Sequence, residues 1–273
     1  MTAQTILPAN SVTGGYEVAN SLRFNSGSSD YLTKTLGTPT LATKATCSMW
    51  FKLAEPTGQN TLFASAGNAA AFYLHTDSTL RVYNVDGSAL TTNRVFRDTS
   101  AWYHLVVAID TTQGTASNRV KVYINGIQET SFSAASYPNQ NSASALGNNS
   151  AHFVGSNTGP ANYFNGYMSE IVLIDGQALA PTSFGEFDED SGIWKPINVS
   201  GLTFGNNGFY LETKQSGTAT NASGMGADTS GNDNHFAVAN LTAVDQSTDT
   251  CTNNFATWNS LFRNKTIWYS NQC

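Results

Sequence analysis

Residues 100–131 constrain the fold of this chain most, because they carry two strand patterns joined by turn signals. Residues 102–109 are almost continuously apolar and rich in β-branched and aromatic side chains, which is typical of a strand covered on both faces. Residues 120–125 alternate apolar and polar side chains, the pattern of a half-buried strand. Asn125-Gly126 follows, and this dipeptide readily takes the positive φ values of a two-residue hairpin turn. The stretch therefore predicts an antiparallel meander.

Similar patterns run along most of the chain. They predict strands at residues 21–24, 31–33, 45–53, 61–64, 71–75, 79–85, 89–96, 151–155 and 163–175. Asp86-Gly87 and Asp175-Gly176 predict two further tight turns of the same kind. Helical periodicity is almost absent. We therefore expect an all-β fold, a two-sheet antiparallel sandwich or jelly roll.

Charged side chains make up only 12% of the 273 residues, and the formal net charge is −6. An acidic, sparsely charged chain offers no basic surface to a phosphate backbone, which argues against a nucleic-acid partner. No apolar run reaches the length of a membrane span. The first residues have neither the basic start nor the apolar centre of a secretion signal, so no signal peptide and no membrane insertion are expected.

The three cysteines have no metal-ligand spacing. Cys47 lies in an apolar strand pattern and is predicted to be a small buried side chain. Cys251 and Cys273 lie in polar surroundings, and the sequence leaves open whether they pair.

The carboxylates and histidines show no catalytic pattern. Retaining glycoside hydrolysis needs two carboxyl groups about 5–5.5 Å apart. The acidic cluster at residues 186–190 follows a Pro-Thr-Ser turn and is predicted to be a solvated turn, while Glu170 stands alone on its strand. His104 lies inside the central strand and is predicted to be a core or sheet-face histidine. We expect that the protein is not an enzyme.

Several segments resemble, in the same order, those of the laminin-G-like/concanavalin-A-like lectin superfamily: SLRFNSGSSDYL, ATCSMWFKL, LFASAG, WYHLVVAIDTTQ, VKVYINGIQET and NGYMSEIVLIDGQAL. The resemblance covers residues 19–190 and implies a jelly roll of two curved antiparallel sheets. It divides the chain into an extended N-terminal arm (1–18), the lectin-like jelly roll (19–190) and a polar C-terminal anchoring or docking section (191–273). Within this last section, residues 228–235 resemble the opening of a further lectin-like module.

Two later segments resemble those that follow this domain in structural proteins of tailed bacteriophages: GQALAPTSFGEFDEDSGIWKPI and GFYLETKQSGTATNASGMGADTSGNDNHFAVANLTAVDQSTDTCTNNFATWNS. This resemblance implies a component on the virion surface, commonly a tail-fibre or host-recognition protein. Its partners would be other virion proteins and a host-surface glycan. Fibres and decorations are usually symmetric, so a homo-oligomer such as a trimer is expected.

In lectin-like jelly rolls, aromatic rings stack on sugars and a calcium ion is often bound at the rim. Four strand-borne tyrosines that are out of phase with their aliphatic neighbours are the glycan-binding candidates: Tyr73, Tyr83, Tyr123 and Tyr163. Calcium prefers oxygen ligands. Asp110, at a strand end, and Asn148 and Asn149, in a loop, are therefore the candidate ligands, although no dense ligand loop is present and no cofactor is required.

We thus expect a non-enzymatic virion structural protein, a tail-fibre or adhesin component that contacts host-surface glycans through its lectin-like domain. One alternative is a head (capsid) decoration or head-fibre protein with a purely structural role, which the apolar end of the chain favours, with Phe262, Ile267, Trp268 and Tyr269. A glycan-degrading enzyme of the same fold is the remaining alternative.

Overall fold

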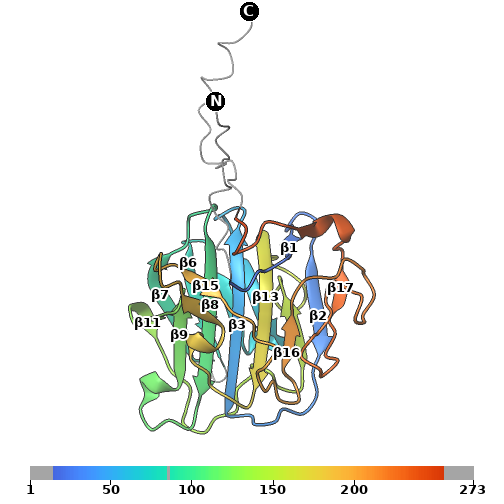
Figure 1. The fold of residues 1–273 in the computed structure, drawn as a ribbon. Helices are drawn as coiled ribbons and strands as arrows, with labels where there is room; N and C mark the ends of the chain where they lie inside the picture. The colour runs from blue at the N-terminus through green and yellow to red at the C-terminus, as the bar shows by residue number, and fades with distance from the viewer. Residues whose placement is uncertain (1–14, 85–86, 255–273) are drawn as a thin grey trace, which may run out of the picture.

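Two large antiparallel sheets pack face to face in the computed structural model, which describes residues 15–84 and 87–254 (Figure 1). The strands of sheet A, in spatial order, are β10 (Ile127–Glu129), β9 (Val120–Ile124), β8 (Trp102–Asp110), β3 (Lys44–Leu53), β13 (Gly166–Asp175), β1 (Ser21–Phe24) and β18 (Gln246–Ser247), with β16 (Phe209–Leu211) paired to β13. Those of sheet B are β11 (Phe132–Ala135), β7 (Ala89–Val95), β6 (Thr79–Tyr83), β5 (Ala71–Leu74), β4 (Asn60–Ser65), β12 (Ala151–Val154), β2 (Tyr31–Thr35) and β17 (Ala237–Ala239). The predicted all-β sandwich is confirmed.

The smaller elements lie outside these two sheets. A short hairpin is formed by β14 (Gly185–Phe187) and β15 (Trp194–Pro196). Helical turns in the described residues are short 3₁₀ helices: η1 (Ala66–Asn68), η3 (Ala116–Asn118), η4 (Pro181–Ser183) and η5 (Ala243–Asp245).

The main core lies between the two sheets. Strand residues alternate between this core and the outer faces, so that Phe51 and Leu105 of sheet A meet Phe63 and Phe72 of sheet B in one buried cluster. Cys47 belongs to the same cluster and is buried, as predicted.

The meander at the centre of sheet A is the one predicted from the sequence. β8 pairs with β3 on one side and with β9 on the other, and it is buried on both faces. Asn125 and Gly126 have φ values of 49° and 78°, so the β9–β10 turn has the positive φ values expected. Asn125 Oδ1 also accepts a hydrogen bond of 2.7 Å from the backbone N–H of His104, which ties the turn to β8.

The outer face of sheet A is covered by the chain that follows β13. Val172 and Ile174 point outward from the sheet into a second buried cluster with Phe184, Val199 and Phe204. A third cluster joins three tryptophans: Trp50, Trp102 and Trp194. We call the parts of residues 177–254 that lie over this face, outside β16, β17 and β18, the cover. The cover makes sheet A the middle layer of the molecule.

The jelly roll does not end at residue 190. β16 and β18 pair with strands of sheet A, and β17 pairs with β2 of sheet B. The segment 228–235 likewise completes this sandwich, because the Asp228 carboxylate accepts hydrogen bonds from the backbone N–H groups of Tyr210, Ser230 and Asn234. Strands of two or three residues carry too little periodicity for the sequence to show which sheet they join.

The hairpin turn predicted at Asp175-Gly176 is not formed. β14 does not pair with β13, and Asp175 Oδ2 instead accepts hydrogen bonds from the backbone N–H groups of Thr40, at 2.6 Å, and Asn207, at 3.0 Å. The side chain thereby holds two loops against the sheet end.

Four predicted features lie outside the described residues: Asp86, most of the arm, the apolar residues after 254, and Cys273 with its possible pairing to Cys251.

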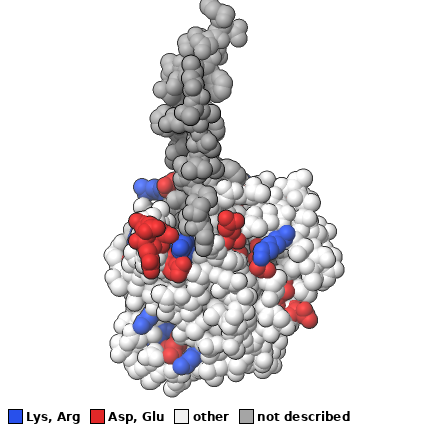
Figure 2. All heavy atoms as spheres, in the orientation of Figure 1, with Lys and Arg blue, Asp and Glu red and all other residues white. Residues whose placement is uncertain are grey.

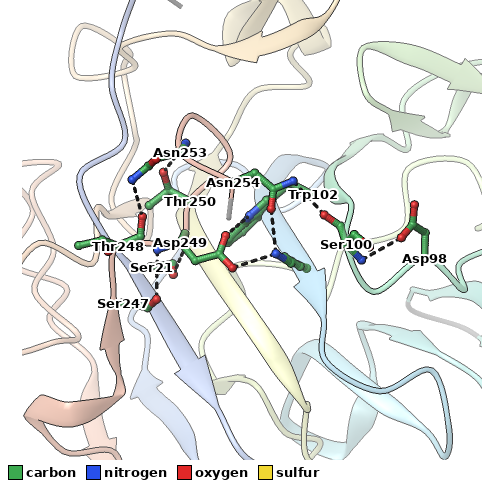
Figure 3. Close-up of polar contacts among 11 residues, drawn as sticks. Ser21, Asp98, Ser100, Trp102, Ser247, Thr248, Asp249, Thr250, Asn253 and Asn254 are labelled. Atoms are coloured by element: carbon green, nitrogen blue, oxygen red, sulfur yellow. Dashed lines mark hydrogen bonds and ion pairs between the residues drawn. The ribbon is translucent and has the colours of Figure 1, made fainter. Parts of the chain in front are cut away.

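A buried ion pair fixes the last described residues to sheet A. Lys52 Nζ donates to Asp249 Oδ2 and to Asn254 Oδ1, both at 2.8 Å, and Trp102 Nε1 donates to Asp249 Oδ1 at 3.0 Å. Figure 3 shows Trp102, Asp249 and Asn254 turned toward one another at one end of the sheet. Close by in sequence, Thr252 Oγ1 accepts a hydrogen bond of 3.0 Å from the backbone N–H of Val18, so both ends of the described chain meet.

Candidate functional site

The outer face of sheet B carries a pocket between the ends of its central strands. In β5 the side chains of Phe72 and Leu74 enter the core, so Ala71 and Tyr73 face outward. In β6 Leu80 and Val82 enter the core, so Tyr83 also faces outward. Ala71 lies directly opposite Tyr83 in the β5–β6 register, and its small side chain leaves a hollow beside the tyrosine ring.

This pocket has a volume of about 370 Å³. Its lining residues come from β4, β5, β6 and the β3–β4 and β12–β13 connections: Gln59, Thr61, Ala71, Tyr73, Tyr83, Asn157 and Asn162. The rings of Tyr73 and Tyr83 are stacked, with centroids 5.7 Å apart and planes inclined by 15°. An aromatic pair beside amide and hydroxyl groups is a composition typical of small-molecule sites.

The connection at residues 156–162 forms one wall of the pocket. Its shape is fixed by the Asn157 N–H, which donates to the Ala161 carbonyl, and by Asn157 Oδ1, which accepts from the Ala161 N–H at 3.0 Å. The Asn162 carbonyl accepts from the backbone N–H of Thr61 at 3.1 Å, which anchors the wall to β4. Asn162 has a φ of 48°, a conformation that asparagine tolerates better than most residues.

Polar atoms in the pocket are poised to bind a ligand. Thr61 is fully buried, and its Oγ1 has no hydrogen-bond partner among the described residues. Burial, first, and the hydrogen bond with Tyr83 raise the pKa of Tyr73 to about 12, so its phenol is neutral and keeps its proton at physiological pH. The described residues that line the pocket include no Asp, Glu, Lys or Arg, and Arg81, which lies opposite Tyr73 in the register, pairs with Asp77 at 3.6 Å. These groups suit an uncharged ligand rich in hydroxyl groups.

The four predicted glycan-binding tyrosines do not share one site. Tyr73 and Tyr83 come together in the pocket. Tyr163 follows the wall and lies on the far side of it, with its ring 6.3 Å from that of Tyr31. Tyr123 is in β9 of sheet A and packs against the second buried cluster, so it does not belong to this site. Gln59, Thr61, Asn157 and Asn162 were missed because only the fold brings these loop and strand-end residues together.

The three candidate calcium ligands lie in local turns, and calcium binding by them stays a prediction. Asp110 already forms an ion pair with Lys44 at 3.2 Å and accepts hydrogen bonds from Thr112 and Gln113. Asn148 Oδ1 accepts from the Ser150 hydroxyl, and Asn149 is exposed. Within residues 15–84 and 87–254, no group of three or more His, Cys, Asp or Glu side chains is arranged to hold a metal ion. These oxygen atoms serve local turns.

A buried serine–histidine pair beneath the cover is not arranged for nucleophilic catalysis. Trp194 Nε1 donates to His104 Nδ1 at 2.9 Å, and an indole N–H can only donate. The proton of the neutral ring therefore lies on Nε2, which donates to Ser48 Oγ at 2.8 Å and cannot accept the serine proton. Burial lowers the pKa of His104 to about 3, which keeps the ring neutral. His104 is thus a buried sheet-face histidine, as predicted.

The acidic segment at residues 186–190 forms the exposed turn of the β14–β15 hairpin. Lys195 makes ion pairs with Glu186, at 3.4 Å, and with Asp188, at 3.1 Å.

Figure 2 shows that charged side chains on the face it presents gather in a few small groups, with wide uncharged areas between them. Among the helices of the described residues, none has the length and apolar character needed to cross a membrane.

Comparison with known proteins places the fold in a family. The family model of the Concanavalin A-like lectin/glucanases superfamily, Laminin_G_3, matches residues 25–182, more than half of the chain. No curated protein matches the sequence. A candidate carbohydrate-binding protein from Bacteroides ovatus has a similar crystal structure, with a TM-score of 0.53 and 11% identity, over 83% of this chain and 61% of that one. The chain therefore spans about three-fifths of that protein.

Two other solved structures are similar over a smaller part of the chain. The heptameric SAP-like pentraxin of Limulus polyphemus has a TM-score of 0.43 and 17% identity, over 61% of this chain and 80% of that one. Domain 4 of the arabinanase AbnA from Geobacillus stearothermophilus, solved with arabinotriose, has a TM-score of 0.38 and 22% identity, over 55% of this chain and 66% of that one.

Proposed function

We propose that this chain, which belongs to the Concanavalin A-like lectin/glucanases superfamily, binds glycans in the Tyr73–Tyr83 pocket on the outer face of sheet B. The observation that carries the proposal is the stacked tyrosine pair in a pocket lined by amides and a buried threonine hydroxyl without a partner among the described residues. Sugars present apolar C–H faces to aromatic rings and hydroxyl groups to amides, so they match both parts of the lining.

Binding of the purified protein to an array of neutral and anionic glycans tests this proposal. Tyr73→Ala and Tyr83→Ala should each weaken binding of the retained glycan by about tenfold, because an aromatic contact contributes about 0.5–1.5 kcal/mol beyond its buried area. Tyr123→Ala is the matched control, since it removes the same side chain from the other sheet. Equal binding by all three folded variants would exclude the pocket. A protein that retains no glycan would contradict the function itself.

We further propose that the chain acts on the surface of a phage particle, as a tail-fibre or adhesin component that contacts host-surface glycans. The resemblance of residues 176–197 and 208–260 to phage structural proteins supports this setting. Its partners would be other virion proteins, and its working form a homo-oligomer such as a trimer. Antibody labelling viewed by electron microscopy tests the location. Label at the tail supports the adhesin, label over the head favours a capsid decoration, and no label on particles contradicts the viral setting.

Two solution measurements separate the remaining alternatives. Release of reducing sugar from the bound glycan would show that the protein is a glycan-degrading enzyme. Glycan binding should be the same with and without a chelator, because the pocket lining holds no carboxylate to attract a calcium ion. Loss of binding in the chelator would instead place calcium in the site.

A further inference from the structure

A second aromatic cluster lies on the same face of sheet B as the pocket. The ring of Tyr31 is 6.2 Å from that of Phe153 and 6.3 Å from that of Tyr163. The neighbours of Phe153 along β12, His152 and Val154, are fully buried, so Phe153 points outward. Tyr163 is held in place by its hydroxyl, which donates to the Pro160 carbonyl at 2.8 Å.

The strand register relates the two aromatic groups. Phe153 pairs with Ala64, Ala64 with Ala71, and Ala71 with Tyr83. Phe153 and Tyr83 thus occupy one row across the sheet, with two alanines between them. Three strand steps of about 4.8 Å separate the two residues by roughly 14 Å, which is wider than a single sugar ring.

The wall of the pocket joins the two groups. Asn162 lines the pocket, and the next residue, Tyr163, belongs to the second cluster. A ligand that extends from the pocket across this wall would therefore come next to Tyr163 and Tyr31. Across the row from Ala237 through Thr33 to Ala89 there is no charged side chain.

Half-buried aromatic residues can also simply finish a sheet surface. The other outer face of the molecule shows what this chain does when aromatic residues have only a packing role. There Trp50, Trp102 and Trp194 are 4%, 8% and 7% exposed, beneath the cover. Tyr31, Phe153 and Tyr163 all remain partly exposed. Aromatic rings left accessible beside a ligand pocket are a feature of recognition surfaces.

We infer that the ligand of the pocket is an oligosaccharide of uncharged sugars that extends from Tyr73 and Tyr83 across the wall to the cluster of Tyr31, Phe153 and Tyr163. This inference rests on the proposed glycan binding. One sugar unit occupies the pocket, and later units stack on the second cluster. Affinity therefore grows with chain length until both groups are in contact.

Calorimetric titration of the full chain with cello-, manno- and laminari-oligosaccharides, from the single sugar to the hexamer, tests the inference. Affinity should rise at least tenfold with length in the series that binds and should change little with ionic strength. Tyr31→Ala should weaken hexamer binding by about threefold to tenfold and leave the single sugar unaffected. Tyr73→Ala should weaken both.

A second variant distinguishes a loss of binding from a loss of folding. Thr33→Arg places a bulky side chain next to Phe153, its partner in the register, without removing any aromatic group. It should weaken the hexamer and spare the single sugar, while Tyr123→Ala should change neither. If Tyr31→Ala and Thr33→Arg both bind the hexamer as the native chain does, the extended ligand is excluded and the pocket remains. If no oligosaccharide of any length binds, glycan binding itself is contradicted.

Discussion

The two outer faces of this sandwich differ in exposure, because one is covered and the other is open to solvent. The outer face of sheet A carries tryptophans, a serine–histidine pair and a buried glutamate, and the cover encloses them. The outer face of sheet B carries tyrosines, amides and alanines, and its aromatic rings stay accessible. The comparison indicates that the ionisable groups enclosed beneath the cover affect the stability of the fold. The proposed binding groups on the open face are instead uncharged tyrosines, amides and a threonine.

The largest effect is expected from the ion pair that fastens the cover. Asp249→Ala removes the partner of Lys52 and leaves an ammonium group buried, so the free energy of unfolding should fall by about 3–5 kcal/mol. Chemical denaturation measures this loss. Replacing both residues, in Lys52→Met with Asp249→Leu, should restore most of the stability. A single variant as stable as the native chain would show that the cover does not depend on this pair.

Trp194→Ala should be nearly as damaging. It removes a large ring from the third buried cluster and the donor to His104, which predicts a loss of about 3 kcal/mol in the free energy of unfolding. Thermal and chemical unfolding measure it, with Ile193→Ala, at an exposed position beside Trp194, as control. A loss no larger than that of the control would contradict the packing role of the cover.

Glu170 should give the enclosed face a pH dependence. It lies in a bulge of β13 with a φ of 51°, is 5% exposed, and accepts hydrogen bonds from Tyr16 and Tyr210. Burial, opposed by these two hydrogen bonds, raises its pKa to about 7. Glu212, Lys214 and Cys251 are the other ionisable groups that interact with it.

A raised carboxyl pKa stabilises the fold below the pKa of an unfolded glutamate, and this contribution is lost as the pH rises through about 7. Its full size is roughly 3 kcal/mol. His104 and His152 act in the opposite direction, because burial lowers their pKa values. The contribution of Glu170 is therefore read as the stability difference between the native chain and Glu170→Gln, measured from pH 4 to pH 8. A difference that does not vary with pH would contradict it.

The smallest stability effect is expected on the open face. Tyr83→Ala should lower the free energy of unfolding by only about 1 kcal/mol, because its ring is half-buried and stacks on a single neighbour. The same variant should weaken glycan binding by about tenfold. A large loss of stability here would remove the contrast between the two faces and would assign Tyr83 to the structure alone.

The sequence predicts the features whose signals lie close together along the chain, and it does not predict those that depend on distant segments. Residues 102–126 carry their own periodicity and turn signal, so the meander could be read locally. The cover could not be predicted, because the partners of Lys52 and Trp50 lie far along the chain in segments without regular pattern. Asp175 was interpreted as a turn residue, although its role is to hold Thr40 and Asn207.

The candidate site shows the same limit. Tyr73 and Tyr83 could be chosen because they are out of phase with the aliphatic residues of their strands. No signal in the sequence separates them from Tyr123, which has the same alternation but lies under the cover. The amides of Asn157 and Asn162 enter the pocket only because their connection folds back on β4. Residue type and phase predict which side chains face outward, whereas topology decides which outer face stays open.

The hydrogen bond between Val18 and Thr252 gives the described chain adjacent ends. A polypeptide that enters at residue 18 and leaves at residue 252 therefore crosses almost no distance, and a sandwich of this kind can be spliced into a longer chain as a cassette. A pull applied between these two residues is carried by the β1–β18 edge of sheet A. Sheet B lies outside that path of force, so the proposed binding face can stay intact while the molecule is under tension.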